Sequence, residues 1–113
     1  MFIIQRNIQQ YITDNGKCPY REWFLSLDEK IKNRIRSRLT RVEVGHFGDW
    51  SSVGDGVFEL RFYFGPGYRI YFGQVGTTIV LLLCGGDKKT QSSDIRKAQE
   101  YWADYRRRSY ESE

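Results

Sequence analysis

Arginines and tyrosines alternate along a predicted pair of strands, and this spacing could bind a phosphate and a base. Residues 57–64 and 68–74 alternate apolar and polar side chains around a glycine–proline–glycine turn at 65–67. Because successive side chains of a strand point to opposite faces, one face is apolar and the other is polar. Arginine forks grip phosphate oxygens, and tyrosine rings stack on unpaired bases. The polar face, predicted to contact RNA, carries Glu59, Arg61, Tyr63, Arg69 and Tyr71.

The length of the turn determines which of these side chains lie opposite each other. A three-residue loop at 65–67 places Tyr63 opposite Arg69 and Arg61 opposite Tyr71. Opposed pairs of this kind make cation–π contacts worth roughly 0.5–1 kcal/mol each at an exposed site. The alternative interpretation is the solvated outer face of a half-buried sheet.

Two lysines follow the next predicted strand, which ends in a glycine pair. Gly85 and Gly86 permit close backbone approach, and they are followed by Asp87, Lys88 and Lys89. We expect the lysines to lie at a strand end beside the arginine face. The N-terminus of the next helix also favours anions, so this segment is suited to holding a phosphate. Solvated loop lysines are the alternative.

A basic helix adds to the positive charge of the chain, which is +4 with a pI of about 9.2. The stretch 28–41 carries six basic residues against two acidic ones. Such a run is often only a solvated helix face, but it is also suited to an anionic partner. The candidate RNA contacts here are Arg34, Arg38 and Arg41.

Several other chemistries do not fit the composition. His46 is the only histidine, which excludes a two-histidine ribonuclease, and we expect it to be a surface residue. Cys18 and Cys84 form no C-x-x-C pair, so zinc is not expected. Glu59 and Asp87 alone do not make a magnesium nuclease site. We therefore expect neither a metal nor a cofactor.

The elements that position these residues define an α+β domain. We expect a first strand at 2–4, a helix at Pro19–Leu25 and a helix after Asp28 with an apolar stripe at 31, 35, 39 and 42. Trp50 to Val53 is a candidate extended piece. Strands at 57–64, 68–74 and 78–84 follow, the last of them central and covered on both faces. A helix from Ser92 or Ser93 completes the order β-α-α-β-β-β-α.

The length of 113 residues fits one domain, 1–113. No apolar run is long enough to span a membrane, and the first residues lack the order of a signal peptide. A cytoplasmic location is therefore expected. The two helices before the sheet form a helical hairpin, and the sheet is predicted to be small and largely antiparallel.

The same segments resemble the RelE/ParE toxin superfamily, most closely its HigB-like "addiction module killer protein" branch. The resemblance covers nearly the whole chain and includes the arginine-rich helix. It is carried by Phe58-Glu59-Leu60-Arg61, by Gly65-Pro66-Gly67-Tyr68-Arg69-Ile70-Tyr71-Phe72 and by Leu82-Leu83-Cys84-Gly85-Gly86-Asp87-Lys88-Lys89-Thr90-Gln91.

This resemblance implies the RelE-like fold and the toxin of a type II toxin–antitoxin pair. RelE-like and HigB-like members cut messenger RNA in the ribosomal decoding site without a metal, by attack of the 2′-hydroxyl on the adjacent phosphate. Arg69 matches the family's arginine and would stabilise the phosphorane, with Arg61 as a second clamp. Lys88 or Lys89 would be the acid. The candidates for the general base, or for contact with a nucleobase, are Tyr71, Tyr63 and Glu59.

Two other functions stay open at this point. ParE-like members inhibit DNA gyrase without cutting nucleic acid, and a binding module without activity is a further alternative. The arginine–tyrosine face and the lysine pair favour cleavage. The family also implies a small helix-turn-helix antitoxin as partner, in a heterotetramer, or a toxin homodimer. The basic helix would contact ribosomal RNA.

Overall fold

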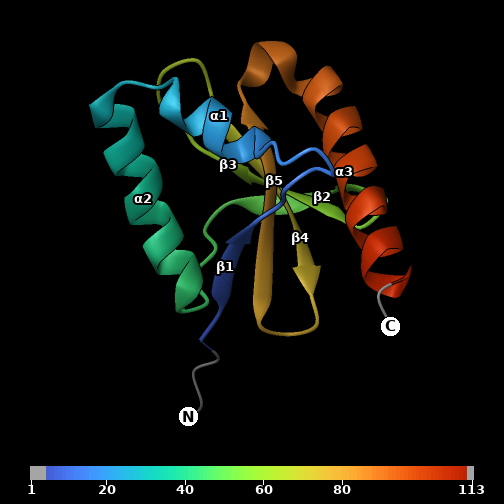
Figure 1. Ribbon diagram of the computed structural model, residues 1–113. Helices are drawn as coiled ribbons and strands as arrows, with labels where there is room; N and C mark the ends of the chain where they lie inside the picture. Colours follow the sequence, from blue (N-terminus) through green and yellow to red (C-terminus); the bar gives the residue numbers. More distant parts are fainter. Residues whose placement is uncertain (1–4, 112–113) are drawn as a thin grey trace.

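The computed structural model describes residues 5–111 and has an α+β fold. A five-stranded sheet of order β1-β5-β4-β3-β2 is flanked by helices, with α1 and α2 on one side and α3 on the other (Figure 1). This is the predicted class. The elements are β1 (Asn7–Gln10), α1 (Pro19–Leu25), α2 (Glu29–Glu43), β2 (Trp50–Gly54), β3 (Val57–Arg61), β4 (Arg69–Val75), β5 (Ile79–Gly86), a 3₁₀ helix (Lys88–Thr90) and α3 (Gln91–Glu111).

The helical hairpin before the sheet forms as predicted. Pro19 opens α1, where a missing backbone N–H costs nothing. The Asp28 side chain caps α2 by accepting a hydrogen bond from the backbone N–H of Ile31 at 3.1 Å. Ile35 and Val42 are fully buried against the sheet. The apolar stripe therefore fixes which face of α2 turns inward and leaves its arginines at the margin.

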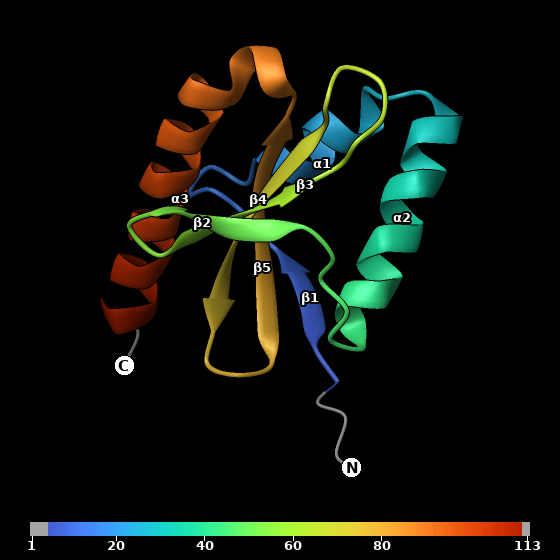
Figure 2. The same ribbon diagram turned by 180° about the vertical axis from the view of Figure 1, so that it is seen from behind.

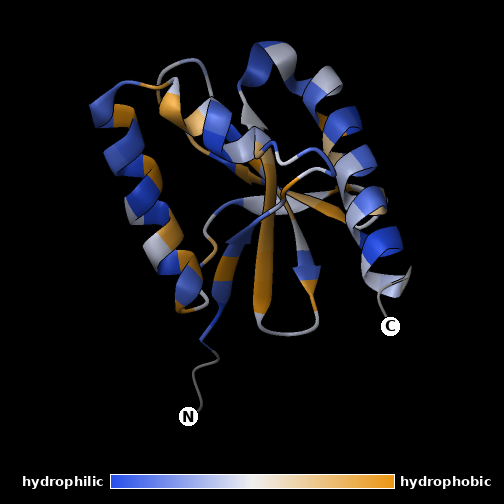
Figure 3. Cartoon of the chain, viewed as in Figure 1, coloured by the Kyte–Doolittle hydropathy of each residue, from blue (hydrophilic) through white to orange (hydrophobic). Residues whose placement is uncertain are grey.

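The sheet is mostly antiparallel, with one parallel pair at its edge. Strand β1 runs parallel to β5, whereas the expected strand at 2–4 lies outside the described residues. The 50–53 piece forms β2, which crosses in front of the other strands when the molecule is seen from behind (Figure 2). Strand β5 is buried on both faces as predicted and is hydrophobic along most of its length (Figure 3). The middle strand is β4, because β1 adds a strand beyond β5.

The register of the β3–β4 hairpin differs by two residues from the prediction. Arg61 lies opposite Arg69, and Glu59 lies opposite Tyr71. The predicted pairs Tyr63–Arg69 and Arg61–Tyr71 are therefore wrong, although a shift of two keeps each side chain on its predicted face. Strand β3 ends at Arg61, so residues 62–68 form a wider loop than the three-residue turn.

Aromatic packing explains the wider loop. Phe62 and Phe64 lie edge to face with ring centroids 5.9 Å apart, and Tyr68 packs on Phe64 at 5.5 Å. The backbone closes through a hydrogen bond from the N–H of Phe62 to the carbonyl of Tyr68 at 3.0 Å. Phe62 and Phe64 also contact Arg38 and Arg34 of α2, and Tyr68 contacts Trp23 of α1, so the loop is held by packing against both helices.

Helix α3 covers part of the face that was predicted to be polar and open. Tyr71 is completely buried in a cluster with Ala98 and Trp102 of α3. Glu59 is 1% exposed. Only the end of the predicted face near Arg61, Arg69 and the 62–68 loop stays accessible. Across residues 5–111, no helix has the length and apolar character needed to cross a membrane.

Candidate nucleic-acid interface

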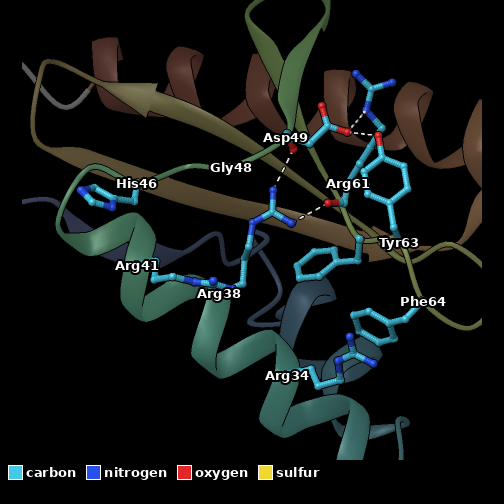
Figure 4. A pocket seen from close by; sticks show the side chains of 10 residues that line it. Arg34, Arg38, Arg41, His46, Gly48, Asp49, Arg61, Tyr63 and Phe64 are labelled. Atoms are coloured by element: carbon cyan, nitrogen blue, oxygen red, sulfur yellow. Dashed lines mark hydrogen bonds and ion pairs between the residues drawn. The ribbon is translucent and has the colours of Figure 1, made fainter.

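A basic pocket of about 460 Å³ lies between α2, the segment after it and the 62–68 loop (Figure 4). Four arginines and a histidine line it against a single carboxylate, so its wall is strongly positive. We call it the arginine pocket. Its lining residues are Arg34, Arg38, Arg41, His46, Gly48, Asp49, Arg61, Phe62, Tyr63 and Phe64.

Arg38 is a structural arginine within this wall. Its Nε and Nη2 donate to the carbonyl of Phe47 at 3.0 and 2.8 Å, and Nη2 also donates to the carbonyl of Asp49 at 2.8 Å. Nη1 donates to the carbonyl of Arg61 at 2.5 Å. Burial, reinforced by the charge of Arg41, lowers the pKa of Arg38. With its donors bound to backbone carbonyls, Arg38 joins α2 to β3 rather than pointing outward.

Two arginines of α2 stack on two phenylalanines of the loop. The Arg38 guanidinium lies 4.7 Å from the ring centroid of Phe62, and that of Arg34 lies 3.7 Å from the ring centroid of Phe64. Arg34 and Arg38 are four residues apart and therefore lie on the same face of the helix. Phe62 and Phe64 are two residues apart and point to the same side of an extended segment, so each arginine meets one ring. Unlike Arg38, Arg34 is exposed.

Asp49 organises the opposite rim of the pocket. Its carboxylate accepts a hydrogen bond from the Tyr63 hydroxyl and lies 3.3 Å from Nε of Arg61 (Figure 4). The hydrogen bond to Asp49 raises the pKa of Tyr63, because it favours the neutral phenol. The Tyr63 side chain is nevertheless 81% exposed. It therefore presents an open ring held at the hydroxyl end.

A buried carboxylate lies beneath the two arginines that the hairpin places opposite each other. Oε1 of Glu59 is 3.7 Å from both Nε of Arg61 and Nη1 of Arg69. Its Oε2 accepts a hydrogen bond from Nε2 of Gln91 at 2.8 Å. Glu59 thus balances two adjacent positive charges and ties them to the start of α3. Such a group holds the arginines in place and does not reach a ligand itself.

A second pocket adjoins the first one and contains a lysine. We call it the loop pocket; its volume is about 550 Å³. The backbone N–H of Lys88 donates to the carbonyl of Pro66 at 3.4 Å, which links the start of the 3₁₀ helix to the loop. Lys89 is exposed and lines neither pocket. The lining residues of the loop pocket are Phe62, Tyr63, Phe64, Gly65, Pro66, Gly67, Arg69 and Lys88.

The glycine pair before these lysines has a packing role. A side chain on Gly85 would clash with the ring of Trp23, and one on Gly86 would clash with the carboxylate of Asp94. The close approach permitted by these glycines is therefore taken up by α1 and α3. The expectation that it admits a phosphate does not fit this arrangement.

Tyr71 is remote from solvent, and its hydroxyl has no hydrogen-bond partner among the described residues. Burial, and then the nearby Glu59 charge, raise the pKa of Tyr71 far above its usual value. Both Tyr71 and Glu59 are buried and do not reach a substrate. Neither is therefore kept as a candidate general base.

Five of the ten residues that line the arginine pocket were not site candidates in the sequence: Gly48, Phe62, Phe64, His46 and Asp49. His46 and Asp49 are the two polar side chains among them. A signal for them exists in the glycines beside them. Gly45 and Gly48 have φ angles of +92° and +71°, which glycine adopts most readily. A Cβ at Gly48 would lie 3.1 Å from the guanidinium of Arg38. Within residues 5–111, no group of three or more histidine, cysteine or acidic side chains is placed to hold a metal ion.

The fold is that of a small α+β protein and is consistent with the RelE-like arrangement. Residues 22–103 match the family described as "Phage derived protein Gp49-like (DUF891)", and the chain belongs to this family. The family is related to the RelE/HigB toxins and is associated with toxin–antitoxin systems. Over 70 residues the chain is 49% identical to an uncharacterized protein of Haemophilus influenzae (strain ATCC 51907 / DSM 11121 / KW20 / Rd), covering 62% of this chain and 71% of the relative.

Proposed function

We propose that this protein is the toxin of a type II toxin–antitoxin pair and that it cuts messenger RNA on the ribosome, as HigB-like toxins do. One observation carries the proposal. Arg61, Arg69 and Lys88 come from three different segments and line two adjoining pockets that share Tyr63. Cations converging on one open ring suit an RNA strand, with its phosphates on the charges and a base on the ring.

The proposed reaction is attack of the ribose 2′-hydroxyl on the adjacent phosphorus. The new oxygen–phosphorus bond closes a 2′,3′-cyclic phosphate, and the bond to the 5′-oxygen of the next nucleotide breaks. Arg69 and Arg61 stabilise the extra negative charge of the phosphorane. Preorganised donors of this kind are each worth about 2.7–4 kcal/mol of transition-state stabilisation. The buried Glu59 keeps both guanidinium groups in position.

Two proton transfers complete the reaction. Lys88 is the proposed acid and donates a proton to the leaving 5′-oxygen. Tyr63 is the proposed base, because its hydroxyl is hydrogen-bonded to Asp49. It would take the proton of the 2′-hydroxyl while passing its own proton to the Asp49 carboxylate. All charges in this scheme come from the protein's side chains, so it requires no metal ion.

The proposed partner is a cognate helix-turn-helix antitoxin, since toxins of related families act with an antitoxin. In the absence of the antitoxin, the toxin would arrest growth by removing translated messages.

Expression of the protein alone in a bacterium, with mapping of transcript 5′ ends, tests the proposal. We expect growth arrest and new ends inside translated codons. We expect Arg69→Gln and Lys88→Gln to lower cleavage at least about a hundredfold. Lys89→Gln removes the same charge one residue away, outside both pockets, and should stay toxic.

Three outcomes would contradict the proposal. Arrest with intact transcripts and damaged DNA would indicate gyrase as the target. No arrest would indicate a binding module. Full toxicity of the folded Arg69→Gln and Lys88→Gln variants would refute the assigned site.

A further inference from the structure

The α2 wall of the arginine pocket has features of a binding site that the proposed cleavage chemistry does not use, because that chemistry involves only Asp49, Arg61 and Tyr63 of this pocket. This wall is formed by α2, Lys88 does not line the pocket, and the wall combines positive charge with a flat stacking surface. The pocket's volume of about 460 Å³ is within the range of small-ligand sites.

We propose that the arginine pocket is a subsite for one nucleotide of single-stranded RNA, whose base stacks on Arg34. This inference rests on the proposed function only for the identity of the strand, which would continue from the loop pocket across Tyr63. Arg34 and Arg41 of α2 would then contact the substrate strand and not the surface of a ribosomal helix.

The stacking surface is the guanidinium of Arg34. One of its faces lies on the Phe64 ring, 3.7 Å from the ring centroid. Phe64 is held in turn by Phe62 and Tyr68, so the platform is rigid. In residues 5–111, no acidic side chain lies within ion-pair distance of Arg34. Arg34 is also exposed, and arginine planes stack well on unpaired bases, so the base would lie on the face turned away from Phe64.

The phosphate of this nucleotide would bind at the other end of the pocket. Arg41 is exposed and lines the wall together with His46. Arg38 provides a fixed positive charge behind them, because its donors are already bound to the carbonyls of Phe47, Asp49 and Arg61. The base platform and the phosphate donors are thus separate groups along one wall.

The shape of the site favours a single strand over a duplex. The platform lies between α2 and the 62–68 loop (Figure 4). Bases in an A-form duplex are already stacked on both faces and cannot insert there, whereas an unpaired base can be turned outward.

Binding of a labelled single-stranded RNA oligonucleotide, followed by fluorescence anisotropy, tests the subsite. Its riboses carry 2′-O-methyl groups, which remove the nucleophile, so that binding is measured without cleavage. Arg34→Lys keeps the charge but removes the flat face, and we expect it to weaken binding at least about fivefold. Arg41→Gln should reduce the slope of log K against log salt by about one.

Arg36→Lys is the matched control. Arg36 lies on the same helix and also covers a phenylalanine, with its guanidinium 5.1 Å from the ring centroid of Phe24, but it does not line the pocket. This control should bind like the wild type, and a duplex of the same sequence should bind more weakly than the single strand.

The subsite is refuted if Arg34→Lys and Arg36→Lys bind the oligonucleotide equally well, or if the duplex binds as tightly as the single strand. The binding assay does not depend on cleavage, so it tests the subsite even if the protein does not cut transcripts. A protein that leaves messages intact in cells but shows the Arg34-specific loss would support the subsite and contradict the proposed nuclease. The reverse pattern would contradict the subsite alone.

Discussion

Replacing Arg38 by lysine is expected to destabilise the fold although the charge is retained. Arg38 donates to three backbone carbonyls, those of Phe47, Asp49 and Arg61. A lysine ammonium at the end of a flexible stem cannot reproduce the planar fork. We expect it to reach one of the three carbonyls and to lose the stacking on Phe62.

The magnitude follows from the two carbonyls that would lose their charged donor. A hydrogen bond to a charged group contributes about 1.5–3 kcal/mol. The site is only half-buried, so water replaces part of the loss. The expected decrease in the free energy of unfolding is about 2–3 kcal/mol, a large part of the roughly 5–15 kcal/mol that domains typically have.

Urea unfolding followed by tryptophan fluorescence measures this change. With a typical urea dependence for small proteins, the midpoint should fall by roughly 1–2 M. Arg41→Lys is the control, because Arg41 is exposed on the same helix, and its stability should stay within about 0.5 kcal/mol of the wild type. If Arg38→Lys also stays within that range, Arg38 does not have the structural role assigned to it.

Three further predictions concern the interior. Glu59→Gln keeps the shape of the side chain but removes the charge that positions Arg61 and Arg69. This variant should lower the rate of RNA cleavage while it remains folded, as its melting curve would show. A cleavage rate equal to that of the wild type would contradict the positioning role. Gly86→Ala should displace Asp94 and lower the melting temperature, and an unchanged melting temperature would contradict the observed packing. Burial raises the pKa of Cys84 to about 12 and, with the hydrogen bond to Asp104, that of Tyr11 to about 12. In the folded protein the Cys84 thiol and the Tyr11 phenol therefore stay neutral at pH values where they would ionise in the unfolded chain. Their contribution to stability is complete below pH ~9 and is lost between pH ~9 and 12, which an alkaline unfolding titration would detect.

The elements themselves could be predicted because their patterns are strongly periodic. The stripe through Ile35 and Val42 fixed the inward face of α2, and the Asp28 cap fixed where it begins. The continuous apolar run 79–83 indicated a strand that is buried on both faces. These patterns depend only on neighbours along the chain.

The register of the hairpin could not be predicted from the same patterns. Alternation of side chains determines the face but not the pairing, and a shift of two residues leaves every face unchanged. What decides the pairing is the packing of Phe62 and Phe64 against α2. This contact joins residues about 25 to 30 positions apart, and nothing in the local sequence reports it.

The candidate site was predictable by residue type more than by role. Arg34 and Arg38 are four residues apart on α2, so they look equivalent in the sequence. The structure buries one against carbonyls and leaves the other exposed on a ring. Lys88 and Lys89 are likewise neighbours of the same type, yet only Lys88 lines the loop pocket. Gly48, which leaves room for the Arg38 guanidinium, was the one local sign of this arrangement.

Cleavage of a defined message on purified ribosomes is the most direct test of the proposed nuclease. The purified protein is added to ribosomes programmed with a synthetic messenger RNA, in parallel with Arg69→Gln and Lys89→Gln. We predict cuts within the codon in the decoding site by the wild type and by Lys89→Gln, leaving a 2′,3′-cyclic phosphate and a 5′-hydroxyl. Arg69→Gln should be at least about a hundredfold slower. An intact message with the wild-type protein, or equal cleavage by Arg69→Gln, would contradict the account.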